Sequence, residues 1–236
     1  MKNNNLEPLH QSVKEHSNEY LAKFLQRFFK TGKGEYAQGD VFAGIKVPVS
    51  RKIAKQFYHL SLKDISILIK SKIHEERLIA LIILTHKMKK ADEQEKEKII
   101  NLYLKSIKYI NNWDLVDLSA DKILGEYLFD KKRDILFELV KGGLWEKRIA
   151  IIASFNFIKK NDFSTTLILS EILLDDKHDL IHKAVGWMLR EIGKRDVSTE
   201  EAFLLKHYKK MPRTMLRYAI EKFPEEKRKA YLEGRM

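Results

Sequence analysis

A tryptophan and an aspartate four residues apart begin a helix that the sequence predicts over residues 112–128. At 100° per residue, Trp113 and Asp117 lie on the same helix face. Asp117 is at the edge of an apolar stripe formed by Val116, Ala120, Ile123, Leu124 and Tyr127. A carboxylate beside an indole at the margin of a core is partly desolvated, which makes Asp117 a candidate functional residue. The alternative, a carboxylate that complements the helix dipole, suits Asp114 better because Asp114 is in the first turn.

Arg148 lies in the first turn of a second predicted helix, over residues 145–160. This helix is apolar almost all round, which predicts burial between neighbouring helices. A cation in the first turn is disfavoured by the helix dipole, so Arg148 should have an anionic partner such as Asp117 or a phosphate. The alternative is an arginine on the surface.

Trp187 belongs to a third predicted helix, over residues 178–195, but lies away from its apolar stripe. It could shield the stems of neighbouring cations, or it could stack on a base or sugar beside bound phosphates. The stripe consists of Ile181, Ala184, Val185, Met188 and Ile192. The cations beside Trp187 are Lys183, Arg190 and Lys194, and with Lys159 and Arg213 they are the predicted DNA-binding residues.

Helical periodicity dominates the whole chain. One long loop, over residues 31–44, contains four glycines, and no segment alternates as a strand would. The predicted helices span 6–30, 48–58, 62–70, 74–89, 92–109, 112–128, 131–141, 145–160, 163–174, 178–195, 198–209, 213–222 and 224–233.

Similar helix starts recur near residues 74, 112, 145 and 178, at spacings of 38, 33 and 33. Such spacing predicts an all-α fold, an α-solenoid of HEAT-like antiparallel helix pairs with a concave basic groove. Trp113, Arg148 and Trp187 are 35 and 39 residues apart, so they would line one edge of that groove. We expect a single domain over 1–236, with charged terminal helices as caps.

Composition limits the possible functions. The hydrophobic fraction of 44% supports a core. The net charge of +12 is typical of proteins that bind an anionic partner such as nucleic acid, and the alternative is that it only keeps the protein soluble. The chain has no cysteine, which excludes disulfide scaffolds, thiolate metal sites and cysteine nucleophiles. The N-terminus lacks the apolar stretch of a signal peptide, and no apolar run reaches the roughly 20 residues of a membrane span. We therefore expect a cytoplasmic protein and a monomer.

Four segments resemble the AlkD-type DNA alkylation repair glycosylases, and the likeness extends over residues 35–222. The resemblance implies a solenoid that binds duplex DNA and hydrolyses the N-glycosidic bond of N3- and N7-alkylated purines without a metal or organic cofactor. It assigns the active site to Trp113, Asp117, Arg148 and Trp187. The segments are residues 39–48, 112–117, 148–151 and 182–191.

Two other functions remain open from the residues alone. One is a DNA-binding module of HEAT type without catalysis, and the other is a scaffold that binds an acidic protein partner. Release of a free base from alkylated DNA distinguishes the enzyme from both. Salt-dependent DNA binding distinguishes the DNA-binding module from the scaffold.

Overall fold

The computed structural model describes residues 5–236, and this part of the chain consists of helices joined by turns and loops, with one isolated bridge between Val41 and Ile73 in place of any strand. The chain divides into two compact units, Met1–Ile123 and Leu124–Met236. The single domain over 1–236 stays a prediction, and each unit is described by itself below.

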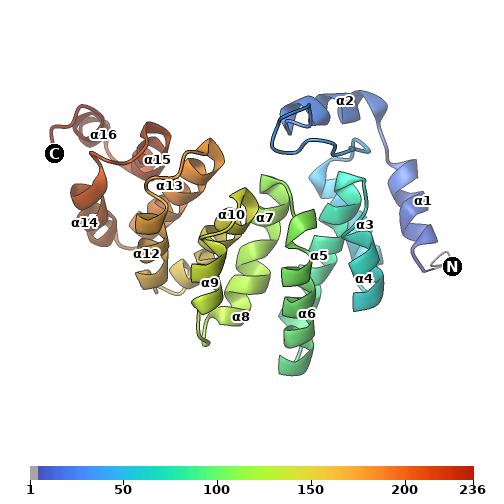
Figure 1. Ribbon diagram of the computed structural model, residues 1–236. Helices are drawn as coiled ribbons and strands as arrows, with labels where there is room; N and C mark the ends of the chain where they lie inside the picture. The colour runs from blue at the N-terminus through green and yellow to red at the C-terminus, as the bar shows by residue number, and fades with distance from the viewer. Residues whose placement is uncertain (1–4) are drawn as a thin grey trace. The chain divides into compact units, whose positions relative to one another are not determined.

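The first unit contains seven α-helices among its described residues (Figure 1). They are α1 (Glu7–Glu15), α2 (Glu19–Phe28), α3 (Val47–Gln56), α4 (Leu62–Leu68), α5 (His74–Lys90), α6 (Glu93–Lys105) and α7 (Trp113–Ala120). Helices α3, α5 and α7 pack in succession, and α4 and α6 pack against α5 and against each other.

The second unit repeats this arrangement (Figure 1). Helices α10, α13 and α15 pack in succession, while α9 packs on α10 and both α12 and α14 pack on α13. Two layers of successive helices make each unit a helix stack of the α-solenoid type. The helices are α8 (Glu126–Leu128), α9 (Asp134–Leu139), α10 (Leu144–Ala153), α11 (Phe155–Ile158), α12 (Ser164–Ile172), α13 (Asp179–Gly193), α14 (Val197–His207), α15 (Arg213–Ala219) and α16 (Glu225–Leu232).

Several of the predicted helices are interrupted. The segment 145–160 divides at Ser154 into α10 and α11, and the segments 92–109 and 213–222 each end in a 3-10 turn. The segment 6–30 forms two helices, because Asn18 adopts an extended conformation and its side chain accepts a hydrogen bond from the Leu21 backbone N–H. This is an N-cap, which starts a new helix. The segment 112–128 changes from α to π geometry over Asp121–Gly125. Such π-helical turns occur often at functional sites.

The four recurring helix starts are confirmed, since α5, α7, α10 and α13 begin at His74, Trp113, Leu144 and Asp179. The predicted stripe of α13 is also confirmed, because all five of its residues are buried. Close packing of α13 on α15 depends on Gly186, where a Cβ would collide with the carbonyl oxygen of Met215. The apolar periodicity therefore identified these four helix starts and the buried face of α13.

The predicted loop over residues 31–44 is held at its end by a buried carboxylate from α5. Glu75 accepts hydrogen bonds from the backbone N–H groups of Ala43, Gly44 and Ile45 at 2.8, 2.9 and 3.1 Å. Gly44 has a φ of +81°, and a Cβ there would collide with the carbonyl oxygen of Asn18. The end of this loop is therefore fixed against both α5 and the start of α2.

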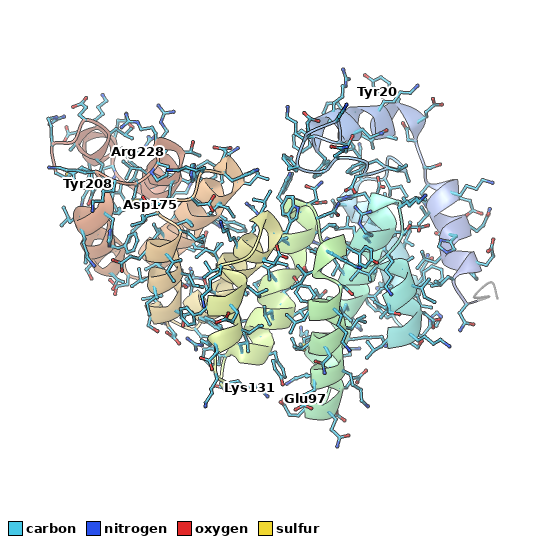
Figure 2. The ribbon with its side chains drawn as sticks, in the orientation of Figure 1. Tyr20, Glu97, Lys131, Asp175, Tyr208 and Arg228 are labelled. Carbon is cyan, nitrogen blue, oxygen red and sulfur yellow. The ribbon has the colours of Figure 1, made fainter. Side chains whose placement is uncertain are left out.

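Glu75→Gln is expected to lower the free energy of unfolding by about 1.5–3 kcal/mol, the usual contribution of hydrogen bonds to a charged group. The amide keeps one acceptor oxygen but turns an N–H₂ group toward backbone donors. Urea unfolding measures the loss. The control is Glu97→Gln, which changes an exposed carboxylate on α6 (Figure 2) and should leave stability unaltered. Equal stability of the two variants would contradict this role of Glu75.

Candidate active site

Trp113 is the first residue of α7, and aromatic rings from α2 and the following residue hold it on one side. The Asn112 side chain caps the helix by accepting a hydrogen bond from the Trp113 backbone N–H at 2.8 Å. The indole stacks on Phe29 at a centroid distance of 5.1 Å, and Phe28 approaches it edge-on at 6.1 Å. Phe29 in turn stacks on Phe42 at 5.0 Å. Trp113 is therefore fixed but only half-buried.

Behind these rings, a buried histidine lies between two carboxylates. His74 Nε2 lies 2.8 Å from Asp114 and Nδ1 lies 3.3 Å from Asp40. Arg77 and Asn111 also donate to Asp40, at 2.6 and 3.0 Å. Because Asp114 follows Trp113 directly, this network connects the start of α7 to the loop and to α5.

The surroundings of His74 favour its charged form. Burial alone would lower the pKa of His74, but the charge of Asp114 and hydrogen bonds to Asp114 and Asp40 outweigh burial and raise this pKa to about 9. Burial would raise the pKa of Asp40, yet the bonds from His74 and Asn111 and the charge of Arg77 lower it. At neutral pH, His74 is therefore an imidazolium that donates from both ring nitrogens.

This raised pKa predicts that the protein loses stability in alkali. An unfolded histidine titrates near 6.5 and His74 near 9, so its stabilising contribution is complete below about pH 6.5 and is lost as pH rises through 9. The full difference corresponds to roughly 3 kcal/mol. Urea unfolding at several pH values measures this loss, with His74→Gln as the control for other titrating groups. A wild-type profile that parallels the control would refute the assignment.

Asp117 lies one turn after Trp113 on α7, on the same helix face, and is half-buried. The charge of Asp117 also acts on a buried tyrosine of this unit. Burial raises the pKa of Tyr103, and the negative charges of Asp121 and Asp117 raise this pKa further. The helix passes into its π-helical turn four residues later. The first unit therefore presents an indole and a carboxylate on consecutive turns, as predicted.

In the second unit, Arg148 is buried in the first turns of α10, so the alternative of a surface arginine was wrong. Its guanidinium donates a hydrogen bond to the carbonyl oxygen of Leu180, in the first turn of α13. Arg148 thus secures the start of the helix that carries Trp187. An anionic partner for Arg148 stays a prediction.

Trp187 is half-buried on α13, outside the buried stripe, as predicted. Its ring lies 5.7 Å from that of Phe155, tilted by 51°. The indole Nε1 donates to Glu191 at 3.2 Å, and Glu191 also pairs with Lys194 at 2.5 Å and Arg195 at 3.4 Å. The neighbours of Trp187 therefore include Glu191, which sequence reasoning omitted although its i,i+4 spacing places it on the same helix face. They also include the ring of Phe155, which comes from another helix and could not be found from helix angles.

The predicted DNA-binding cations all have neighbours within the second unit. Lys183 pairs with Asp179 at 2.7 Å, Arg190 pairs with Glu221, and Lys194 pairs with Glu191. Lys159 lies over the Phe155 ring at 4.8 Å, and Arg213 donates to the carbonyl oxygen of Leu232 at 2.5 Å. Their contacts with DNA stay predictions, and a phosphate would have to compete with these partners.

A family model for DNA alkylation repair enzymes matches residues 9–223. The chain belongs to this family. It is also similar in fold to a solved structure described as a predicted DNA alkylation repair enzyme from Enterococcus faecalis, with a TM-score of 0.68 and 16% identity. That similarity covers 89% of this chain and 98% of the other. Among curated protein sequences, none matches this chain significantly.

Membership makes the chain an enzyme of DNA alkylation repair, with DNA as its substrate. Within residues 5–236, no helix is long and apolar enough to span a membrane.

The network around His74, which positions Trp113, was missed by sequence reasoning. Its residues come from three segments more than 30 residues apart, and no periodic pattern connects them.

Proposed function

We propose that this alkylation repair enzyme is a DNA glycosylase, which hydrolyses the N-glycosidic bond of N3- and N7-alkylated purines in duplex DNA. The observation that supports it most is on α7, where the fixed indole of Trp113 and the carboxylate of Asp117 occupy consecutive turns. An aromatic face and a carboxylate are the two groups that a cationic lesion requires.

Asp117 is the proposed catalytic residue. An alkylated purine carries a positive charge and leaves as a neutral base, so the reaction needs little acid catalysis. As the bond breaks, positive charge develops on the sugar, and a fixed carboxylate stabilises it. The same carboxylate holds the water that bonds to C1′ and accepts the proton that this water loses.

Trp113 and Trp187 supply aromatic faces for the lesion and its surroundings. A cation over an indole gains about 0.5–2 kcal/mol. Arg148 adds a buried positive charge beside the start of α13, which favours a nearby phosphate of the damaged strand. The predicted cations, which are Lys159, Lys183, Arg190, Lys194 and Arg213, would bind further phosphates along a concave groove.

The direct test is incubation with duplex DNA that contains one 7-methylguanine. A glycosylase releases the methylated base and leaves an abasic site, which alkali converts to a strand break. DNA binding without either product would instead support a binding module without catalysis. Transfer of the methyl group to a cysteine of the protein is excluded, since the chain has none.

Trp187→Ala is expected to reduce the rate of base excision strongly and the free energy of unfolding only moderately. The side chain is half-buried outside the core stripe, so its loss should cost less than the roughly 3–5 kcal/mol of a fully buried aromatic residue. Single-turnover excision and urea unfolding measure the two effects. Trp187→Phe is the matched control, because it keeps a ring while losing the bond to Glu191. A large loss of stability with normal excision would contradict the proposed role.

A further inference from the structure

Helix α2 carries a stripe of exposed aromatic residues. Tyr20, Phe24 and Phe28 are spaced by four residues, so they lie along one helix face. Their exposed fractions are 86%, 50% and 53%. The opposite side of the helix buries Ala22 in a cluster that also contains Phe29 and Phe42. Since α2 has this separate core face, Tyr20 and Phe24 are not required for its packing, while Phe28 contacts Phe29 and Trp113 and keeps half of its surface exposed.

The aromatic stripe, defined as Tyr20, Phe24 and Phe28, leads to Trp113. The rings of Phe24 and Phe28 are nearly parallel, at 12°, with their centroids 6.2 Å apart. Phe28 then meets the Trp113 indole edge-on at 6.1 Å. Tyr20 stands at the other end, on the outer side of α2 (Figure 2). The stripe is therefore continuous with the proposed site and extends from it into solvent.

The charges around this stripe are mostly positive, with Glu19 and Glu35 at its two ends. Residues 20–34 include Lys23, Arg27, Lys30 and Lys33 and no acidic residue. All four cations are exposed. Lys23 pairs with Glu19 at 2.8 Å through two exposed side chains, and Lys30 lies 3.9 Å from Glu35. Aromatic rings set among cations fit a nucleic acid strand, because rings stack on bases and cations bind phosphates.

We propose that the aromatic stripe is a stacking surface for unpaired bases of the DNA strand that passes Trp113. The inference rests on the proposed function only in placing the lesion at Trp113. Base faces are covered in an intact duplex, so the exposed rings of Tyr20 and Phe24 can stack only where bases are unpaired. The stripe therefore gives the enzyme a preference for DNA that is locally opened.

The test is fluorescence anisotropy with two undamaged duplexes, one fully paired and one with a bulge of three unpaired nucleotides. The wild type should bind the bulged duplex about tenfold more tightly, the effect of one stacked base. Tyr20→Ala combined with Phe24→Ala should remove this preference and leave binding to the paired duplex within about twofold. Phe24→Tyr, which keeps a ring, should retain the preference, and Phe24→Leu should weaken it.

The matched control is Ile168→Ala combined with Ile172→Ala, which removes two apolar residues from α12 with similar exposed fractions, 49% and 51%. This control should bind both duplexes like the wild type. Equal affinities of the wild type for the two duplexes would overturn the proposal, and so would an unchanged preference in the aromatic double variant. Self-association of the wild type that the double variant abolishes, measured by sedimentation, would assign the stripe to a protein contact instead.

Because these duplexes carry no lesion, the result is independent of catalysis. A wild type that prefers bulged DNA but releases no base would refute the glycosylase and leave the stacking surface in place. A wild type that releases the base but shows no preference for bulged DNA would refute the stacking surface and leave the glycosylase in place. Circular dichroism melting of each variant confirms that it is folded before its binding is compared.

Discussion

Asp117→Asn is expected to lower base excision by roughly 10²–10³-fold, the usual effect of losing one well-placed electrostatic stabiliser. Asparagine has the shape of aspartate and keeps some of its hydrogen bonds but carries no charge. The half-buried position of Asp117 makes its charge more effective than it would be in bulk water. Binding to undamaged DNA should stay equal or become tighter, because a repulsion with the phosphates disappears.

The control for this loss of charge is Asp134→Asn, which neutralises an exposed carboxylate in the first turn of α9. Asp134→Asn should affect the binding of undamaged DNA as Asp117→Asn does, and it should leave base excision unchanged. A melting curve must accompany each assay, since an asparagine that disrupts an internal partner of Asp117 would lower stability as well. Near-normal excision by a folded Asp117→Asn variant would remove Asp117 from the mechanism.

His74→Ala is expected to lower the free energy of unfolding by about 3–5 kcal/mol, as when one partner is removed from a buried ion pair. The variant leaves Asp114 and Asp40 without the imidazolium that donates to both. It also removes the ring that stacks on Phe42 at 4.3 Å. Urea unfolding at neutral pH measures this loss.

His86→Ala is the matched control, because His86 is also on α5 and is half-buried beside Tyr58, where no carboxylate pairs with it among the described contacts. Its removal should cost less than about 1 kcal/mol. If His74→Ala costs no more than this control, the buried network does not stabilise the start of α7. Trp113 would then depend on its aromatic neighbours alone.

Local pattern predicted most of the architecture. The stripe of α13 and the starts of α5, α7, α10 and α13 follow from apolar periodicity, which depends on near neighbours in the sequence. The break at Asn18 was missed because the apolar positions continue across it, although an asparagine before a glutamate is a frequent N-cap.

The features of the site that the sequence did not predict depend on contacts between segments far apart in the chain. Trp113 and Asp117 were identified by their spacing, but the stacking of Trp113 on Phe29 requires α2 to fold back over α7. Sequence reasoning also missed the aromatic stripe, because Phe24 and Phe28 were interpreted as parts of a charged terminal helix. Only the structure shows which of the aromatic faces of α2 are buried and which are exposed.

The central claim is that the enzyme hydrolyses the bond between sugar and base. Its most direct test is a single-turnover reaction in ¹⁸O-labelled water with a duplex that carries one 7-methylguanine, followed by mass spectrometry. The account predicts free 7-methylguanine with its methyl group intact and one ¹⁸O atom on the sugar. Unmodified guanine left in the strand, with no free base, would contradict it.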